Sequence, residues 1–253
     1  MEDIKLWHGD CLELMQDIEA GSIDAIICDP PYGTTACKWD SVIPFGAMWE
    51  QLNRVIKPNG AIVLFGSEPF SSALRMSNIK NYKYDWIWDK LVGKSGAISK
   101  RQPMRQYENI IIFINGGSFY YPIMEERNPK NIRVSGNGKK DSITGIKKIP
   151  GLKSGKMKFP TNILKYGAQS KGLNSKHRQH PCQKPVLLME YLIKTYTNKG
   201  ETVLDFTMGS GSTLVACQNT NRNGIAIEQL DKYFNIAQER TTANRERLSQ
   251  LLF

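Results

Sequence analysis

The segment TVLDFTMGSGSTLVAC, Thr202 to Cys217, combines a strand, a turn and a helix in one short unit. Its apolar beginning ends in an acid, Asp205, and is typical of a buried strand. A turn with Gly209 and Gly211 follows, and Ser212 opens an apolar stretch that predicts a helix. Glycine lets backbone approach a ligand closely, and a helix N-terminus offers free N–H groups. The segment therefore predicts a binding turn at the carboxyl end of a strand.

The next predicted strand, GIAIE, ends in a second acid, Glu228. An acid about 20 residues beyond such a turn is where nucleotide-binding α/β folds contact a ribose hydroxyl. Only one glycine pair of the phosphate-binding type is present, and Asp205 would repel a pyrophosphate. An adenosine ligand without a charged phosphate tail therefore fits better than NAD.

The rest of the sequence alternates expected strands with expected helices. Strands are expected at residues 4–10, 23–28, 61–65, 84–90, 109–115, 202–206 and 224–228. Helices are expected at residues 11–18, 45–56 (closed by KPNG), 69–77 and 186–197, from Ser212, and in a long amphipathic stretch to the C-terminus. This order predicts an α/β fold with a mostly parallel, doubly wound sheet covered on both faces.

The stretch AIICDPPYGTT, Ala25 to Thr35, places two prolines and a tyrosine directly behind a predicted strand. Asp29 is the last side chain of that strand. Pro30 and Pro31 lack N–H groups and have a fixed φ, so the chain leaves the sheet stiffly with both carbonyls free to accept hydrogen bonds. Taken alone, the stretch fits either a proline-stiffened turn or a binding edge at the end of a strand.

Charge is concentrated in one region of the 253-residue chain, whose formal net charge is +10. Between Asn128 and Lys176 there are twelve Lys and Arg residues and one acid, Asp141, so this region carries +11 and the remainder −1. The region is rich in glycine and poor in periodic apolar residues, which indicates an insert with little core of its own. Such a local excess of positive charge favours a polyanionic partner over a merely solvated loop.

Several classes of protein are disfavoured. No stretch approaches the roughly 20 apolar residues of a membrane span, and the acidic beginning, MEDIKLWHGD, lacks the order of a signal peptide. The five cysteines include no C-x-x-C pair, and His177, His180 and Cys182 make a poor zinc site, so no metal is expected. We expect a soluble cytoplasmic protein.

Three motifs in order resemble the β-class DNA amino-methyltransferases: DPPY, then HPCQKPVLLMEYLI, then LDFTMGSGSTLVAC. The resemblance implies a Rossmann-like methyltransferase fold. It also implies a catalytic half at residues 1–115, a basic target-recognition insert at 116–180 and a cofactor-binding half at 181–253. The implied activity is methylation of an exocyclic amino group in DNA, with S-adenosylmethionine as the cofactor.

The resemblance assigns the catalytic motif to Asp29, Pro30, Pro31 and Tyr32. An exocyclic amino nitrogen is a weak nucleophile because its lone pair is delocalised into the ring. The Asp29 carboxylate and the Pro30 carbonyl are the implied acceptors that relax this conjugation, and Tyr32 offers a face for a base that has left the helix.

The resemblance also assigns cofactor and DNA contacts. Glu228 matches the acid on the ribose, Lys184 a residue beside the methionine carboxylate and Asp10 an acid near the adenine, although Asp10 also fits a helix cap. The expected cofactor-binding residues are Asp10, Cys11, Lys184, Asp205, Phe206, Gly209, Ser210, Gly211, Ser212 and Glu228. The expected DNA-binding residues are Arg133, Lys139, Lys140, Lys147, Lys148, Lys153, Lys156 and Lys158. The expected partner is double-stranded DNA, with a homodimer and a restriction endonuclease as further candidates.

Alternatives remain for the reaction. Asp in the first motif position is commoner in adenine-N6 than in cytosine-N4 enzymes of this class, which favours adenine. The Pro-Cys-Gln sequence around Cys182 also fits a cytosine-C5 mechanism with a cysteine nucleophile, but that mechanism leaves DPPY without a role. A non-catalytic nucleic-acid-binding module would need the basic insert but not Asp29 and Tyr32.

Overall fold

The computed structural model describes residues 3–35, 37, 40–94, 96, 99–117, 120–128, 156–167 and 183–251. The chain divides into two compact units, a large one formed by Met1–Tyr121 and Asn162–Phe253 and a small one formed by Pro122–Thr161. In the small unit, β6 (Glu125–Glu126) and β7 (Met157–Lys158) pair in antiparallel fashion. None of the helices within the described ranges has both the length and the apolar composition needed to cross a membrane.

The large unit is built on an eight-stranded sheet in the order β1-β10-β9-β2-β3-β5-β4-β8. Its strands are β1 (Ile4–His8), β2 (Ile23–Cys28), β3 (Ile56–Gly66), β4 (Tyr82–Lys94), β5 (Arg105–Ile114), β8 (Ile163–Lys165), β9 (Thr202–Asp205) and β10 (Asn223–Glu228). Neighbouring strands are parallel, except that β5 is antiparallel to β3 and to β4. The predicted α/β class with a mostly parallel sheet is confirmed.

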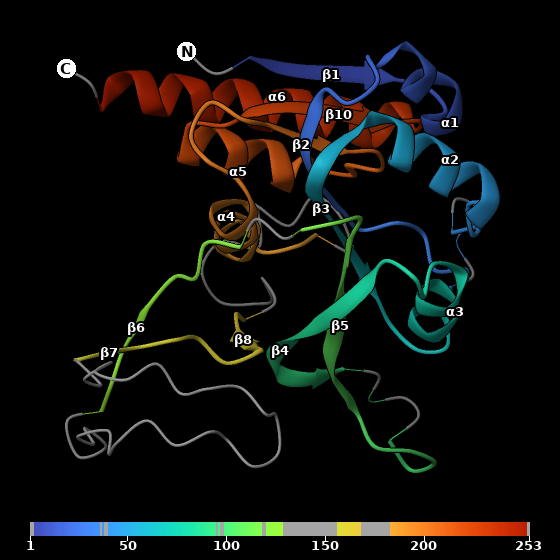
Figure 1. Ribbon diagram of the computed structural model, residues 1–253, viewed down its shortest axis with the longest axis vertical. Coiled ribbons are helices and arrows are strands. Elements are labelled where there is room, and N and C mark those ends of the chain that lie inside the picture. Colours follow the sequence, from blue (N-terminus) through green and yellow to red (C-terminus); the bar gives the residue numbers. More distant parts are fainter. Residues whose placement is uncertain are drawn as a thin grey trace. The chain divides into compact units, whose positions relative to one another are not determined.

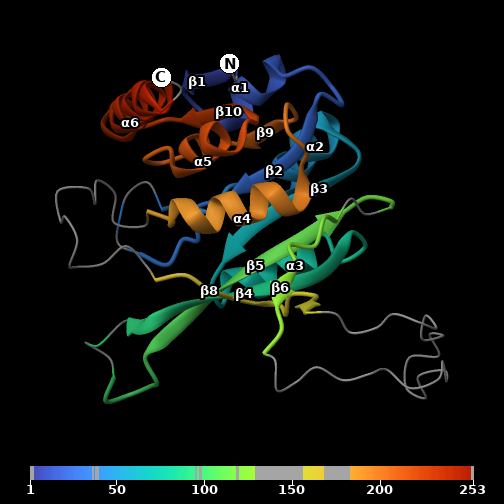
Figure 2. The same ribbon diagram turned by 90° about the vertical axis from the view of Figure 1, so that its left-hand side faces the viewer.

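Helices cover both faces of this sheet. They are α1 (Cys11–Leu14, continued by a 3₁₀ turn, Met15–Asp17), α2 (Phe45–Val55), α3 (Phe70–Ser77), α4 (Val186–Tyr196), α5 (Ser212–Thr220) and α6 (Asp231–Gln250). Figure 1 shows α1, α2 and α3 on one side of the strands and α4, α5 and α6 on the other, and Figure 2 looks onto the second side. Alternating residues of β2 serve the two faces: Ile26 packs with the first set of helices, and Ile27 packs with α4 and α5.

One edge of the sheet gathers the ends of most strands. Because β2, β3, β4, β9 and β10 run in the same direction, their carboxyl ends meet at this edge, as in other open α/β sheets. Asp29 directly follows β2, while Asp205 and Glu228 end β9 and β10. The antiparallel strand β5 brings its beginning to the same edge, where Glu108 pairs with Trp88 of β4.

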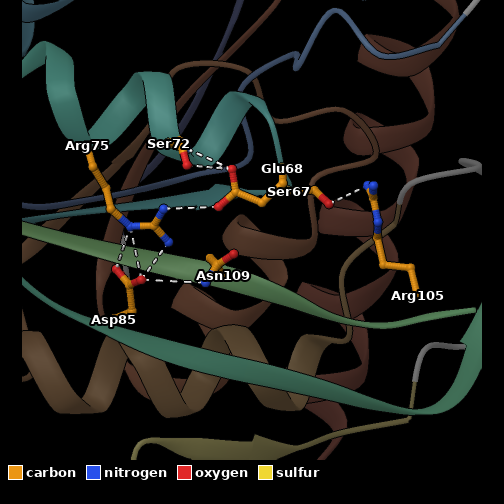
Figure 3. A network of polar contacts seen from close by, with 7 residues as sticks. All are labelled: Ser67, Glu68, Ser72, Arg75, Asp85, Arg105 and Asn109. Atoms are coloured by element: carbon orange, nitrogen blue, oxygen red, sulfur yellow. Dashed lines mark hydrogen bonds and ion pairs between the residues drawn. The ribbon is translucent and has the colours of Figure 1, made fainter. Parts of the chain in front are cut away.

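A polar network joins α3 to β4 and β5 (Figure 3). Arg75 of α3 donates to Asp85 of β4 at 2.6 Å and to Glu68 at 3.2 Å. Separately, Arg105 at the start of β5 donates to the Ser67 hydroxyl at 2.6 Å, directly beyond the end of β3. These contacts fix the helix and the two antiparallel strands against one another.

The beginning of β3 differs from the sequence expectation. KPNG was expected to close helix 45–56 ahead of a strand at Ala61, but β3 already begins at Ile56. The expected boundary is wrong because Ile56 and Ala61 pair with Ile23 and Ala25 of β2, so KPNG bulges within the strand. The very short strands β6, β7 and β8 were not expected, since two or three residues show no periodicity.

Candidate active site

A cavity of about 280 Å³ lies at the carboxyl edge of the sheet. Its volume is near the lower end of small-molecule pockets, roughly 300–1,000 Å³. The sequence-predicted residues on its wall are Asp10, Cys11, Asp29, Pro30, Pro31, Tyr32, Lys184, Asp205, Phe206, Gly209, Ser210, Ser212 and Glu228. The fold thus brings the predicted catalytic and cofactor-binding residues together, apart from Gly211, which is not on the wall.

A chain of alternating charges runs away from Asp29. Lys184, in the loop before α4, donates to Asp29 Oδ2, and its Nζ lies 3.2 Å from Glu108 Oε2. The other oxygen of Glu108 accepts from Lys90 of β4. Lys184 is 7% exposed, and its Nζ lies 4.9 Å from the centre of the Phe65 ring. The lysine that the resemblance places beside a cofactor carboxylate therefore contacts the proposed catalytic carboxylate.

Asp29 and Glu108 respond differently to this environment. Burial raises the pKa of the Asp29 carboxyl, although Lys184 acts in the opposite direction. Burial also favours a higher pKa for Glu108, but the ammonium groups of Lys184 and Lys90 outweigh it, and the pKa of Glu108 is lowered. Glu108 is therefore the firmly ionised member of the chain, and Asp29 is the member that takes up a proton more readily.

Tyr32 is hydrogen-bonded to the side chain of Asp29, and Thr207 is hydrogen-bonded to its backbone carbonyl. The Tyr32 hydroxyl donates to Asp29 Oδ1 at 2.5 Å, and the Thr207 hydroxyl donates to the Asp29 carbonyl at 3.1 Å. The Tyr32 ring is stacked on Phe70 of α3, with ring centres 5.0 Å apart and planes inclined by 24°. The orientation of Tyr32 is thus set by Asp29 at the edge of the sheet and by Phe70 of α3, which covers one face of the sheet.

Asp40 is a site residue that sequence reasoning missed. Its carboxylate accepts four backbone N–H groups, from Tyr32 at 2.8 Å, Gly33 at 2.9 Å, Thr34 at 3.0 Å and Thr35 at 2.7 Å. Burial favours a higher pKa for Asp40, but these and other hydrogen bonds outweigh it, and the pKa is lowered. Asp40 thereby fixes the chain that follows the Pro-Pro dipeptide.

The glycine turn and Glu228 form the other half of the cavity wall. Gly209 N donates to Glu228 Oε2 at 3.0 Å, and Leu230 N donates to Oε1 at 2.9 Å, so both carboxylate oxygens are oriented. Gly211 adopts a φ of 74°, and a Cβ at this position would lie 2.9 Å from the Ala237 Cβ of α6. Glycine is required there for helix packing, so Gly211 acts on the turn from behind the wall.

Asp205, the last residue of β9, is buried in the cavity wall. Thr213 donates to its Oδ2 at 2.5 Å, and Thr207 N donates to its Oδ1 at 3.3 Å. Burial raises the pKa of Asp205 to about 6, although the Thr213 hydrogen bond opposes the shift. A cation placed beside this carboxylate would favour its ionised form.

Two further wall residues, Asp10 and Ser210, have hydrogen-bond partners within the fold. Asp10 caps α1, because its Oδ1 accepts from Leu12 N at 2.8 Å and from Glu13 N at 3.2 Å. Arg240 of α6 donates to the Ser210 hydroxyl at 2.9 Å. Within the described ranges, no group of three or more His, Cys, Asp or Glu side chains is placed to hold a metal ion.

Six of the eight predicted DNA-binding residues lie outside the described residues, as does Cys182; the six are Arg133, Lys139, Lys140, Lys147, Lys148 and Lys153. Lys156 and Lys158 lie in or beside β7, and Lys158 forms an ion pair with Glu125 of β6 at 2.8 Å.

Like Asp40, the site residues Glu108 and Thr207 were missed by sequence reasoning. Only the strand topology shows that Glu108 reaches the carboxyl edge.

Replacing Asp40 tests whether its carboxylate holds the loop. Asp40→Asn puts an NH₂ group against backbone N–H donors and removes the charge, so we expect a loss of about 1–3 kcal/mol in the free energy of unfolding. Urea denaturation measures this loss, and Glu50→Gln on the exposed side of α2 is the control. Equal stability of Asp40→Asn and the wild type would contradict the role.

The raised pKa of Asp205 predicts a pH dependence of stability. Between about pH 4 and pH 6 the folded protein binds a proton at Asp205 that the unfolded chain has released, so stability falls as pH rises through this window. The full effect is at most about 3 kcal/mol. Asp205→Asn should reduce the slope without abolishing it, because burial also raises the pKa of Asp29 and Glu228. Urea denaturation at several pH values checks this, and an unchanged slope would contradict the assignment.

Comparisons with known proteins identify the family of this chain. A family model described as DNA methylase, of the N6/N4 methyltransferase type, matches residues 23–239. The type II methyltransferase M.HpaI of Haemophilus parainfluenzae is 27% identical, covering 94% of this chain and 74% of the relative. The DNA adenine methyltransferase YhdJ of Escherichia coli is also 27% identical, covering 92% of this chain and 81% of the relative.

A solved structure gives the same result. The crystal structure of an M1.HpyAVI–SAM complex superposes with a TM-score of 0.60 at 26% identity, covering 94% of this chain and 98% of the other. Since the family model spans most of the sequence, the chain belongs to the N6/N4 DNA methylase family and is a DNA methyltransferase.

Proposed function

We propose that the protein transfers a methyl group from S-adenosylmethionine to the exocyclic N6 nitrogen of an adenine in duplex DNA. The observation that carries the proposal is the position of Asp29, which faces the same cavity as Asp205 and Glu228. Adenine is favoured over the N4 nitrogen of cytosine by the Asp in the first motif position and by the relative named as a DNA adenine methyltransferase. A cytosine-N4 enzyme is the alternative.

The cavity wall fits the proposed cofactor. Glu228 presents two oriented oxygens that still have lone pairs for ribose hydroxyls. Asp205 offers a carboxylate to a positively charged part of the ligand. Gly209 has a φ of 52°, which favours glycine, and it has no side chain that would obstruct the approach of a ligand to the turn. When bound, S-adenosylmethionine supplies a methyl group on a positively charged sulfur.

Asp29 prepares the amino group of the base. Its oxygens already accept from Tyr32 and Lys184, and each retains a lone pair that can accept a hydrogen from the target amine. Together with the Pro30 carbonyl, such a contact draws the nitrogen lone pair out of the ring and stabilises the charge that develops on the nitrogen. Alignment of the amine with the methyl group then supplies the remaining acceleration.

The transfer must also dispose of one proton. As the methyl–nitrogen bond forms and the methyl–sulfur bond breaks, the nitrogen becomes positively charged and releases a hydrogen as a proton. Asp29, whose pKa is raised by burial, is the acceptor in contact with that hydrogen, and it passes the proton to solvent. Tyr32 supplies a ring surface for the base, which leaves the duplex to reach the site.

Other parts of the chain complete the proposal. The basic insert at residues 116–180, which separates the two halves of the core in the sequence, binds DNA and selects the target sequence. A restriction endonuclease partner is supported by the name of the type II relative M.HpaI. The proposal also includes a homodimer, which is tested by measuring the mass of the purified protein by light scattering.

Replacing Asp29 tests the proposal directly. We expect Asp29→Ala to abolish methyl transfer to DNA while S-adenosylmethionine binding largely persists, because the carboxylate acts on the amine. Transfer is measured with methyl-labelled cofactor, and binding by calorimetry on protein whose folding has been checked by thermal unfolding. Cys182→Ser is the control and should remain active, since no cysteine nucleophile is needed.

The methylated base identifies the substrate. Mass analysis of nucleosides from DNA methylated by the wild type should show N6-methyladenine. N4-methylcytosine would replace the adenine assignment by the alternative, and a covalent DNA adduct would point to Cys182. Substantial transfer by Asp29→Ala would contradict the mechanism itself.

A further inference from the structure

We propose that Thr207 is a positioning residue for methyl transfer. Its hydroxyl holds the peptide bond between Asp29 and Pro30 in the orientation that lets the Pro30 carbonyl accept a hydrogen of the target amine. The inference rests on the proposed function and adds to it a residue that lies far from DPPY in the sequence. Thr207 lies on the cavity wall and acts on the amine through the backbone of the catalytic motif.

The contact between Thr207 and Asp29 lies just beyond the paired parts of two neighbouring strands. Parallel pairing of β2 with β9 reaches as far as Ile26 and Leu204. Three residues farther along each segment, the Thr207 hydroxyl donates to the Asp29 carbonyl at 3.1 Å. A side-chain hydroxyl therefore joins the catalytic motif to the cofactor-binding turn where the chain has left the strand ladder.

The chemistry of proline makes this hydrogen bond important. The peptide bond between Asp29 and Pro30 has no N–H, so its carbonyl is the only group through which a hydrogen bond can fix its plane. The peptide unit is planar and the proline ring fixes φ, so a rotation of this plane would carry the Pro30 carbonyl with it. Holding the Asp29 carbonyl therefore limits where the proposed acceptor can lie.

The backbone on both sides of Thr207 is fixed. Phe206 and Met208 are buried, and they pack in different apolar clusters. The Thr207 N–H donates to Asp205 Oδ1 at 3.3 Å. The Met208 N–H donates to the Ile227 carbonyl of β10 at 2.9 Å. Because threonine is also stiff about χ1, its hydroxyl is presented from a rigid base.

Cys28 orients the hydroxyl further. Its Sγ lies 2.9 Å from the Thr207 hydroxyl oxygen, and its side chain is fully buried. The hydroxyl has one hydrogen, which it donates to the Asp29 carbonyl, so the thiol is the donor in this second contact. Burial, together with the charge of Asp205, raises the pKa of the Cys28 thiol well above its usual range, so the thiol keeps its hydrogen. The two side chains thus form a short chain of hydrogen bonds that ends on the catalytic motif.

Thr207 also connects the two carboxylates that the proposed reaction uses. Its N–H contacts Asp205, which faces the cofactor in the proposed function, and its hydroxyl contacts the backbone of Asp29. The amine and the methyl group must meet in line, and a displacement of about 1 Å can lower the rate roughly 100-fold. A residue that sets this geometry affects the transfer step more than the binding of either substrate.

Removal of the hydroxyl tests this role. In the full chain, Thr207→Val keeps the shape of the side chain and removes the donor. The probe is a duplex with a target site mapped by sequencing methylated DNA from cells that express the enzyme. Single-turnover transfer with saturating duplex and S-adenosylmethionine should fall about 10- to 100-fold, while the Kd of each changes little. Thr207→Ser restores a hydroxyl and should recover most of the rate.

Thr220→Val is the matched control. It removes a hydroxyl that donates to the backbone carbonyl of Ala216 at 2.7 Å, and it lies at the last residue of α5, whose first residue, Ser212, is on the cavity wall. This variant should transfer methyl groups at the wild-type rate. Thermal unfolding checks the folding of each variant, and Thr207→Ala replaces Thr207→Val in the comparison if the valine variant does not fold.

Three results would overturn the inference. The first is wild-type transfer by a folded variant that lacks the Thr207 hydroxyl. The second is a weakened Kd for S-adenosylmethionine with an unchanged rate at saturation, which would place the hydroxyl on the cofactor. The third is a Thr207→Ser variant as slow as Thr207→Val, which would make the hydroxyl irrelevant. Substantial transfer by Asp29→Ala in the same assay would instead contradict the proposed function.

Discussion

The site depends on a chain of ion pairs in which positive and negative side chains alternate, namely Lys90, Glu108, Lys184 and Asp29. Lys184 is buried beside aromatic rings, and an unpaired ammonium group in that place would cost several kcal/mol. Glu108 supplies the lasting negative charge because two lysines contact it. Lys184 can therefore remain charged while Asp29 changes its contacts during the reaction. Asp29 is thus held by Lys184, whose positive charge is also balanced by Glu108.

Sheet topology makes this chain of charges possible. The four residues come from the β4 strand, the β5 strand, the loop before α4 and the end of β2, and they meet because β5 runs opposite to its neighbours. Asp40 and Tyr32 then fix the segment that leaves β2. The turn around Gly209, together with Glu228, forms the adjoining part of the same cavity. Both halves of the site are thus fixed relative to one sheet edge, which suits a reaction that needs two bound molecules in line.

Much of this fold was predictable from the sequence because apolar strands and amphipathic helices alternate with clear periods. The motif residues were predictable as well, since Asp29, Asp205 and Glu228 each stand where a parallel strand ends. Asp40 and Glu108 were not predictable, because their roles arise from contacts between segments that only the folded chain brings together. The same holds for Lys184: the motif identified the residue, but only the fold shows its carboxylate partner. The bulge at KPNG escaped prediction because strand pairing, not the local sequence, decides where β3 begins.

The most direct test of the account asks which group Lys184 serves. Lys184→Met keeps the length of the side chain and removes its charge. The account predicts that single-turnover methyl transfer at saturating S-adenosylmethionine falls by about 100-fold, as when one catalytic hydrogen bond is lost, while the Kd for S-adenosylmethionine changes little. A weakened Kd with an unchanged transfer rate at saturation would contradict the account and would place Lys184 on the cofactor instead.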